Sequence, residues 1–354
     1  MDRRRTRVVH VGGVLIGGDN PVVVQSMTKT DTKDIDATAA QIRDLTVHGC
    51  EIVRLAVKDV DAARALKLIK EQVGIPIVAD IHFDARLALF AIESGVDKVR
   101  INPSNIKDKG LVRAVAQAAR VAGIPIRVGA NLGSMDATTR PEDRPQALAT
   151  EALHEAALFE EEGFRDIVVS VKSSDVREMV EAVRIIATST DYPLHLGVTE
   201  AGPLRQSLVK SSAGLAPLLL AGIGDTIRYS ITGDPALEVD AAWALLAALG
   251  LRRNRPTIVS CPMCGRCEVV NLLALVHELE ERLGEVHHAV TVALMGCVVN
   301  GVGEGKSADV GIACGKETGV LFIRGQAIRN VEPARFVDTL IAEANNLLTD
   351  RAPQ

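Results

Sequence analysis

A repeating unit between residues 21 and 250 constrains the fold more than any other feature of the sequence. Each unit has a short Val- and Ile-rich run, which indicates a buried strand, followed by a helical pattern. The expected strands are 21–27, 52–57, 75–82, 98–103, 125–131, 166–172, 193–200 and 225–231, and helical patterns between them include 59–73, 84–94, 110–122, 144–162 and 175–188. Eight such units predict an α/β fold with a (β/α)8 TIM barrel. A doubly wound sheet is the alternative, but it rarely repeats so evenly.

The composition supports parallel strands covered by helices. Aromatic residues make up only 3% of the 354 residues, although 47% are hydrophobic. The core must therefore consist mainly of Val, Ile, Leu and Ala, which is typical of strands buried on both faces. A chain of this length can bury one large core and a smaller one.

The segments outside the repeats predict a small hairpin and a second domain. Residues 7–11 and 14–16 flank Gly12 and Gly13 and are expected to pair as a hairpin that plugs the barrel floor. We assign residues 1–250 to the barrel, 251–256 to a charged linker and 257–354 to a smaller α/β domain. In that domain we expect strands at 257–261, 289–295, 310–313 and 319–323, and helices at 267–283 and 333–348.

Basic residues lie inside five of the apolar strands. They are Arg54, Arg100, Arg127, Lys172 and Arg228. A buried cation is costly unless it is paired or faces solvent, so a single one is best explained by a structural ion pair. Five at similar strand positions are harder to explain in that way. Because the carboxyl ends of barrel strands form the mouth where active sites lie, we expect these residues to bind a phosphate or diphosphate group.

Other polar residues follow the same strands. They are Asp80, His82, Asn102, Asn131, Ser170, His195, Glu200 and Ser230. Any one of them is more simply a structural polar group. As a set they predict a polar cup, in which Glu200 is our candidate proton donor or acceptor.

Two cysteine segments near the C-terminus indicate a metal centre. The first is Cys261-Pro-Met-Cys264-Gly-Arg-Cys267, and the second places Cys297 seven residues before Glu304. Thiolates from two segments can hold one centre, and a second C-x-x-C pair elsewhere in the chain, as a zinc ribbon would need, is missing from the sequence. Soft ligands with a nearby carboxylate suit an iron–sulfur cluster with one labile position. A redox dithiol and a structural zinc knuckle are the alternatives.

Charge and targeting signals narrow the functional class. The net charge of −5 gives no indication of nucleic-acid binding. Six cysteines without a secretory signal favour a reducing, cytoplasmic environment and metal binding rather than disulfides. Since no apolar run is long enough to span a bilayer, we expect no membrane association.

Five strings together resemble one enzyme family. They are VVQSMT at 23–28, VADIHF at 78–83, VRINP at 99–103, LHLGVTEAG at 194–202 and GCVVNG at 296–301. They are similar to 4-hydroxy-3-methylbut-2-enyl diphosphate synthases, iron–sulfur oxidoreductases of the methylerythritol phosphate route to isoprenoids. The resemblance covers nearly the whole chain and fits the bacterial two-domain form.

The resemblance implies a reaction and a set of site residues. The implied reaction is the reductive ring opening of 2-C-methyl-D-erythritol 2,4-cyclodiphosphate, with two electrons from reduced flavodoxin or ferredoxin and loss of water. A 4Fe–4S cluster would be held by Cys261, Cys264 and Cys297, with Glu304 on the fourth iron. The five barrel cations would clamp the diphosphate, together with Asn102, Asn131, His195 and Ser230. The working form would be a head-to-tail homodimer with shared sites.

One residue departs from the family pattern. Cys267 adds a third thiol at ferredoxin-like spacing and competes with Cys297 as a possible ligand, although we favour Cys297. Cys50 and Cys314 are interpreted as small buried residues. Two rival classes remain: a pterin-type barrel for methyl transfer with an accessory metal site, and a zinc-stabilised interaction module. The first does not explain the cysteines, and the second does not explain the barrel cations.

Overall fold

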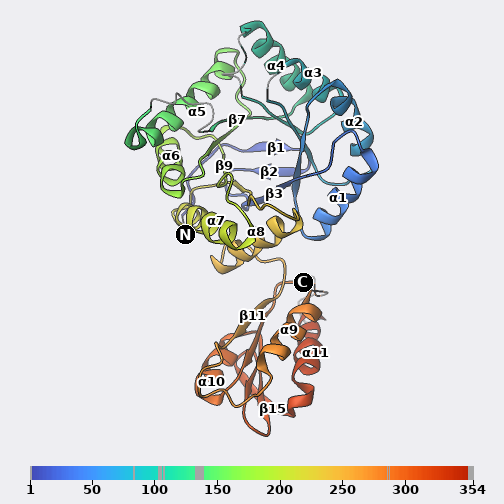
Figure 1. Ribbon diagram of the computed structural model, residues 1–354, viewed down its shortest axis with the longest axis vertical. Coiled ribbons are helices and arrows are strands. Elements are labelled where there is room, and N and C mark those ends of the chain that lie inside the picture. The colour runs from blue at the N-terminus through green and yellow to red at the C-terminus, as the bar shows by residue number, and fades with distance from the viewer. Residues whose placement is uncertain are drawn as a thin grey trace. The chain divides into compact units, whose positions relative to one another are not determined.

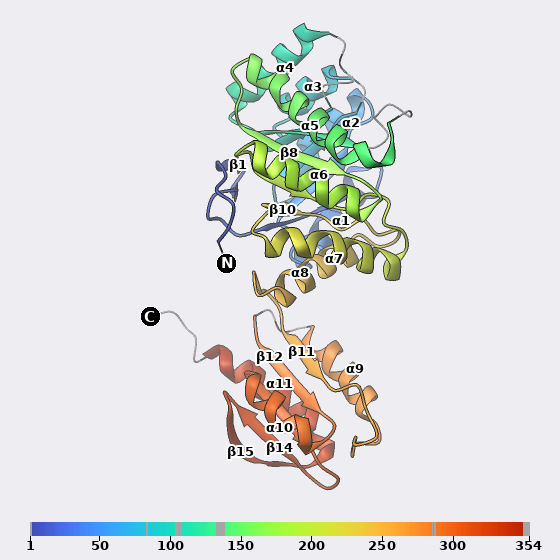
Figure 2. The ribbon, with the colours of Figure 1, turned by 90° about the vertical axis from the view of Figure 1, so that its left-hand side faces the viewer.

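The computed structural model describes residues 2–82, 84–102, 106, 108–131, 139–284, 286 and 288–349, apart from the side chains of Asn131, Asn300, Leu348 and Thr349. The chain divides into two compact units, Met1–Arg252 and Arg253–Gln354. Each unit has its own sheet and its own hydrophobic core (Figures 1 and 2). None of the described helices is both long and apolar enough to cross a bilayer.

The first unit is a closed barrel of parallel strands, which confirms the predicted fold class. Its strands pair in the order β10-β3-β4-β5-β6-β7-β8-β9. They are β3 Val23–Met27, β4 Ile52–Ala56, β5 Ile77–Asp80, β6 Lys98–Arg100, β7 Ile126–Asn131, β8 Ile167–Lys172, β9 Leu194–Leu196 and β10 Thr226–Ile227. All eight strands are shorter than expected, most of all β9, which ends before Gly197, and β10, which contains only two residues.

Helices surround the barrel, and aspartates fix where several of them begin. The helices are α1 Ile35–Val47, α2 Val60–Lys70, α3 Arg86–Glu93, α4 Lys109–Ala122, α5 Arg144–Glu161, α6 Val176–Ser189, α7 Leu204–Leu220 and α8 Ala236–Ala248. The side chains of Asp34, Asp59, Asp108 and Asp175 each accept a hydrogen bond from a backbone N–H of the first turn. Such caps contribute about 1 kcal/mol each. Gly123 ends α4 in the left-handed conformation that glycine adopts without strain.

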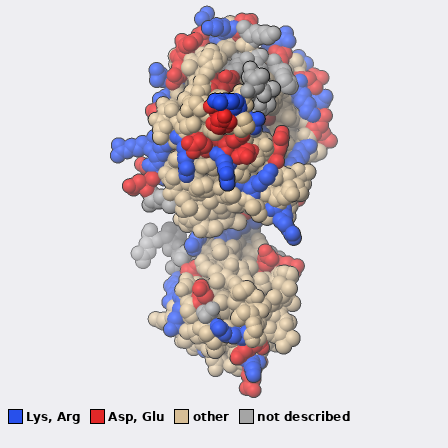
Figure 3. All heavy atoms as spheres, turned by 60° about the vertical axis from the view of Figure 1, so that its left-hand side comes forward, with Lys and Arg blue, Asp and Glu red and all other residues tan. Residues whose placement is uncertain are grey.

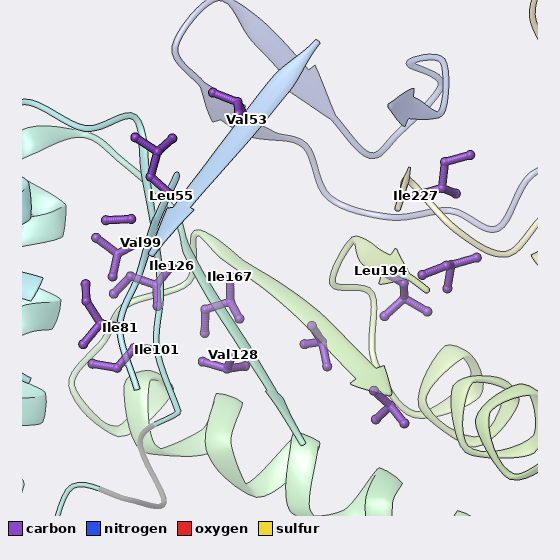
Figure 4. Packing of buried hydrophobic residues seen from close by; sticks show 14 of the residues in the cluster. Val53, Leu55, Ile81, Val99, Ile101, Ile126, Val128, Ile167, Leu194 and Ile227 are labelled. Carbon is purple, nitrogen blue, oxygen red and sulfur yellow. The ribbon is translucent and has the colours of Figure 1, made fainter. Parts of the chain in front are cut away.

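Alternation along the strands separates an aliphatic outer layer from a polar interior. Outward-facing residues such as Val53, Val99 and Ile167 pack with the helices in the large core cluster (Figure 4). Their neighbours along the same strands point inward, because successive side chains of a strand alternate between its two faces. The inward positions are therefore where Arg54 and Lys98 lie.

The predicted hairpin forms and closes the floor of the barrel. Strands β1 Val9–Val11 and β2 Val14–Ile16 pair antiparallel. Val9, Val11 and Ile16 pack in one buried cluster with Val23, Ile52, Val78 and Val168, which are inward-facing residues from the beginnings of their strands or close to them. Figure 1 shows both strands lying across the barrel. Apolar side chains thus close the floor of the barrel.

The second unit is a five-stranded sheet with three helices among its described residues. Strands β11 Thr257–Ser260, β12 Thr291–Met295 and β13 Val310–Cys314 are parallel, and β14 Gly319–Ile323 and β15 Gln326–Val331 continue the sheet antiparallel. The helices are α9 Leu272–Leu283, α10 Val298–Ser307 and α11 Phe336–Thr349, which follows the short 3-10 turn Pro333–Arg335. Leu279, Ile312 and Phe336 contribute to its core.

Three predictions for the second unit were wrong. The helix expected from residue 267 begins only at Leu272, so the residues after the last motif cysteine are not helical. The sequence analysis also missed β15 and α10. Helix α10 contains Gly301, Gly303 and Gly305, which are poor helix formers and therefore suggest a loop.

Packing explains two glycines of α10. A Cβ on Gly301 would lie 3.0 Å from the Cβ atoms of Met295 and Ala313, and one on Gly305 would lie 3.2 Å from the Phe322 ring. These two glycines therefore let the helix lie close to the sheet.

The hairpin generates a stability prediction. Ile16→Ala removes side-chain volume from the fully buried floor cluster and should lower the free energy of unfolding of the barrel by about 2–5 kcal/mol. Leu15→Ala, on the exposed face of the same strand, is the matched control and should have little effect. Urea denaturation measures both. Equal losses for the two variants would contradict the plugging role.

Candidate functional site

The five predicted cations converge inside the barrel. Arg54, Arg100, Arg127 and Lys172 are at most 9% exposed, and the side chain of Arg228 is 12% exposed. Burial lowers the pKa of Lys172 well below its usual value, and the other four cations lower it further. Residues from five strand segments therefore act on one another electrostatically.

Their depths in the barrel differ, which corrects the expectation that all five lie at the mouth. Arg127 is the second residue of β7 and is only 1% exposed, so it lies near the floor. Arg100 is its register partner on β6. Lys172, in contrast, is the last residue of β8. The cations thus line the interior from near the floor up to the mouth.

Asp80 holds two of the arginines together. Its carboxylate lies 3.5 Å from Arg54 Nε and 3.2 Å from Arg100 Nη1, and it also contacts His82 Nε2 at 3.3 Å. Burial alone would raise the pKa of Asp80, but Arg54, His82 and Arg100 outweigh burial and hold that pKa well below its usual value. Asp80 is therefore ionised and orients both guanidinium groups.

Glu238 on α8 is a second anchor that sequence reasoning missed. Its carboxylate lies 3.3 Å from Arg228 Nε and 3.5 Å from Lys29 Nζ. It also accepts hydrogen bonds from Ser26 Oγ at 3.1 Å and from the backbone N–H of Ile231 at 3.1 Å. The available signal was an acidic residue in the first turn of a mostly apolar helix, which also fits an ordinary helix-end charge.

The interior retains more positive charge than these two carboxylates balance. The Nε and Nη1 atoms of Arg127 are buried without a hydrogen-bond partner among the described residues. Burial lowers the pKa of Arg127 well below its usual value, and Arg54 and Arg100 lower it further. On the surface, Figure 3 shows acidic and basic side chains interspersed over the visible face of the barrel unit. The excess of cations is thus a property of the interior.

The remaining predicted barrel residues lie at several positions. Asn102 follows β6 and is 4% exposed, and its Oδ1 has no hydrogen-bond partner within the described part of the chain. His195 is fully buried on β9, and Ser170 is buried on β8. Ser230 follows β10, and its carbonyl oxygen accepts a hydrogen bond from Ser207. The side chain of Asn131 lies outside the described residues.

Glu200 lies beyond the end of β9 and has an unusual backbone. It is exposed, and its φ of 50° is in the left-handed region that residues other than glycine rarely adopt. Strained backbone of this kind concentrates at functional sites. The geometry is compatible with a side chain presented at the barrel mouth.

In the second unit, the cysteine segments meet at one edge of the sheet. Strands β11, β12 and β13 run parallel, so their carboxyl ends lie together, and Cys261, Cys297 and Cys314 follow or end these strands. Gly296 lies between the thiols: a Cβ there would be 2.5 Å from Cys267 Sγ and 3.3 Å from Cys261 Sγ. The Gly296 N–H also donates to Cys261 Sγ at 3.3 Å. Only a residue without a side chain fits at this position.

The other ligand candidates flank this edge. Cys264 is exposed in the loop after β11, and Cys297 is the buried N-cap residue of α10. Glu304 is exposed on α10, about two turns after Cys297. Cys314 is buried as expected, and burial together with nearby Cys267 and Cys261 raises its pKa to about 12.

The chemistry of the donor set, thiols with a nearby carboxylate, suits an iron–sulfur centre. Among the described residues, no three Cys, His, Asp or Glu side chains are close enough to hold one metal ion. The ligands of a multi-iron cluster bind different iron atoms and so do not meet at one point. Thiols from two segments beside a glycine without a side chain fit such a group.

Comparison with known proteins gives matches over both units. The GcpE TIM-barrel domain matches residues 6–243, and the GcpE protein C-terminal domain matches residues 257–346. Two curated relatives are 4-hydroxy-3-methylbut-2-en-1-yl diphosphate synthases (flavodoxin). The protein from Lawsonia intracellularis is 47% identical over 98% of each chain. That from Geobacter sulfurreducens is 47% identical over 99% of each chain.

Two solved structures resemble this chain in fold. Dihydropteroate synthase from Stenotrophomonas maltophilia has a TM-score of 0.52 at 14% identity and covers 69% of this chain and 99% of its own. N-acetylneuraminic acid synthetase from Leptospira borgpetersenii also has a TM-score of 0.52 at 14% identity, over 79% of this chain and 98% of its own. At this identity the likeness extends to the fold only and carries no support for the pterin alternative.

The Asp80 geometry generates a second prediction. Asp80→Asn leaves Arg54 and Arg100 without their shared counter-charge and should destabilise the barrel by about 3–5 kcal/mol at neutral pH. Since the folded-state pKa of Asp80 lies below its unfolded value, its stabilising contribution is present above the unfolded pKa and is lost as the pH falls through the folded pKa.

Denaturant titration at neutral and acidic pH tests this prediction. The wild type should lose more stability on acidification than Asp80→Asn does. Asp84→Asn, which breaks an exposed ion pair with Arg86, is the control and should cost at most about 1 kcal/mol. An Asp80→Asn protein as stable as the wild type would show that the arginines do not depend on this carboxylate.

Proposed function

The chain belongs to the GcpE family, and from this premise we propose that it is an iron–sulfur oxidoreductase that forms 4-hydroxy-3-methylbut-2-enyl diphosphate. The proposed substrate is 2-C-methyl-D-erythritol 2,4-cyclodiphosphate, an intermediate of the methylerythritol phosphate route to isoprenoids. Two electrons open its ring at a C–O bond, and an oxygen leaves as water. The observation that carries the proposal is the excess of buried positive charge inside the barrel, which matches a ligand with two phosphoryl groups.

The cations are proposed to bind the diphosphate. Arg54, Arg100, Arg127, Lys172 and Arg228 donate charge-assisted hydrogen bonds, and arginine suits phosphoryl oxygens through its planar fork. Asp80 and Glu238 keep three of these arginines oriented before the ligand arrives. Asn102, Asn131, His195 and Ser230 are proposed as further substrate contacts. The bound phosphoryl groups then attract the cations and so offset the repulsion among them.

Glu200 is proposed to move a proton at the barrel mouth. The leaving oxygen must gain protons to depart as water, and an exposed carboxyl group beyond the end of β9 is suitably located for that transfer. Its strained backbone supports this role, because strain is retained where it positions a functional side chain.

Cys261, Cys264, Cys297 and Glu304 are proposed to hold a 4Fe–4S cluster. When bound, the cluster supplies the two electrons for the ring opening. Gly296 supports a shared site for the two segments, because its missing side chain leaves room for the Cys261 and Cys267 thiols of the first segment directly beside Cys297 of the second. Glu304 is proposed as the weakly held oxygen ligand, since a carboxylate is a poorer match than a thiolate for such iron.

The electrons are proposed to come from reduced flavodoxin, which the names of the curated relatives mention, or from a ferredoxin. The chain is proposed to act in the cytoplasm, where its cysteines remain reduced. Neither a nucleic acid nor a membrane is part of the proposed mechanism.

A head-to-tail homodimer is proposed to complete the site. Arg252 bonds to the carbonyl oxygen of Val22 at 2.7 Å and to Glu51 at 2.7 Å, and these residues immediately precede β3 and β4. The barrel unit therefore ends at its floor, whereas substrate enters at the mouth. Helix α8 alone spans ~20 Å, and a six-residue linker also reaches at most ~20 Å. A second copy can instead bring its cysteine unit to the mouth, with two equivalent sites.

Turnover with a chemical reductant tests the proposed function. Anaerobically reconstituted wild type should bind iron and sulfide and convert the cyclic diphosphate in the presence of dithionite. Cys297→Ala should lose the cluster and the activity because it removes a ligand, while Cys267→Ala should keep both. Iron and sulfide analysis and product detection provide the measurements. A Cys267→Ala protein that loses its cluster, beside a Cys297→Ala protein that keeps it, would reverse the ligand assignment.

Subunit mixing tests the clamp and the dimer together. Arg127→Ala should weaken substrate binding by about ten- to a hundred-fold, since one charge-assisted contact contributes roughly 1.5–3 kcal/mol. Mixed with Cys297→Ala chains, it should regain part of the activity, because one site of each heterodimer has an intact barrel and an intact cluster. Mixed chains that exchange subunits yet stay inactive, or an active monomer, would rule out shared sites.

A further inference from the structure

Below Arg54 and Arg100 lies a layer of buried polar groups in which Gln25 and Lys98 have no role in the proposed function. Gln25, Lys98 and His195 are at most 1% exposed. Both amide atoms of Gln25, Nζ of Lys98 and Nε2 of His195 have no hydrogen-bond partner among the described residues. Together with the two free nitrogen atoms of Arg127, they form a group of unpaired polar atoms inside the barrel.

The strand register locates this layer near the floor. Lys98 is opposite Val78, which packs against the hairpin, and it is the first residue of β6. His195 is opposite Thr226, which is in turn opposite Val23 of the floor cluster. Gln25 is two residues beyond Val23 and points to the same side of β3. The three residues therefore lie between the apolar plug and the arginines.

Unpaired groups at this depth call for a ligand with acceptor atoms. A buried polar group without a hydrogen bond costs free energy, and a buried amine without a counter-charge costs more. The unpaired atoms are mostly donors: Lys98 Nζ, Gln25 Nε2 and the two Arg127 nitrogens. The nearby carboxylates of Asp80 and Glu238 are already engaged with other cations. Water alone would supply hydrogen bonds but no negative charge.

We propose that Lys98 and Gln25, together with His195 and Arg127 of the proposed substrate contacts, form an inner oxoanion-binding layer that binds oxygens of a phosphoryl group below Arg54 and Arg100. The assignment of this phosphoryl group to the cyclic diphosphate rests on the proposed function. Inorganic phosphate presents the same oxygens and is the alternative source. Lys98 is then a residue that binds the ligand directly. A phosphoryl group reaches its depth only after passing Arg54 and Arg100.

Binding at this layer should be accompanied by proton uptake. Lys98 faces Arg54 from β4, Arg127 from β7 and His195 from β9, while Asp80 on β5, Arg100 on β6 and Lys172 on β8 lie further toward the mouth. Burial lowers the pKa of Lys98 well below its usual value, and Arg127 and Arg54 lower it further. An arriving oxoanion favours the ammonium form, so the amine gains a proton as the ligand binds.

Calorimetry of the full-length, cluster-containing protein tests the proposal. The cyclic diphosphate and, separately, inorganic phosphate are titrated at one neutral pH in two buffers with different ionisation enthalpies. The wild type should take up protons with either ligand. Lys98→Met should bind about ten-fold or more weakly, because one charge-assisted contact is lost, and should take up fewer protons. Lys98→Gln keeps a neutral donor and should bind better than Lys98→Met without restoring the proton uptake.

Thermal unfolding separates binding from a structural role. Lys98→Met replaces an unpaired buried amine by an apolar chain of similar length, so its melting temperature without ligand should equal or exceed that of the wild type. Lys70→Met, a helix α2 lysine that pairs with Asp97, is the control and should leave ligand affinity unchanged. Unchanged affinity and proton uptake in both Lys98 variants, or a fall in melting temperature for both, would overturn the proposal.

The two ligands distinguish this proposal from the proposed function. If phosphate binds in a Lys98-dependent way but the cyclic diphosphate does not bind, the inner layer is supported and the proposed substrate is refuted. Binding of the cyclic diphosphate that is insensitive to Lys98 would leave the substrate standing and refute the inner layer. Binding of neither ligand would refute both.

Discussion

Positive charge buried inside the barrel is the constraint on which the rest of the structure depends. Two unit charges 4 Å apart in surroundings of effective dielectric 20 repel by about 4 kcal/mol. In the interior the cations lie close enough for Arg54, Arg100, Arg127 and Arg228 to lower the pKa of Lys172. Asp80 and Glu238 relieve part of this repulsion, each by contacting two cations. The aliphatic layer between strands and helices must supply the stability that the interior lacks.

The hairpin strengthens this arrangement because it closes the lower interior with apolar side chains. Val9, Val11 and Ile16 close the floor, so charges near it interact through protein rather than through water. In this interior an unpaired Lys98 or Arg127 costs more folding free energy than it would in water. A phosphoryl group that pairs with these residues therefore binds more tightly. The hairpin thus helps to keep the dielectric constant of the interior low. This low dielectric constant sets both the cost of the buried cations and the strength with which they bind a phosphoryl group.

Much of this was predictable from sequence, and the exceptions have physical causes. The barrel followed from eight repeats, and the cations were visible as charges in apolar strands. Glu238 was not identifiable, because its partners Ser26 and Arg228 reach it only after the barrel closes. Lys98 was overlooked because a lysine at the first position of a strand normally reaches solvent. Helix α10 was missed because packing against Met295 and Ala313 overrides the low helix propensity of glycine.

The two units meet the demands of the proposed chemistry by opposite means. The barrel holds its charged groups rigidly through shared carboxylates, which suits recognition of a fixed charge pattern. The thiols lie instead in loops at the carboxyl ends of parallel strands, and Cys264 and Glu304 are exposed. Gly296 links the two segments, because its N–H donates to Cys261 Sγ and its carbonyl oxygen accepts from the backbone N–H of Glu268. Ligands in loops can close around a cluster after the sheet has folded. The buried arginines must instead be ordered during folding, because their burial is tolerable only when their carboxylate partners are in place.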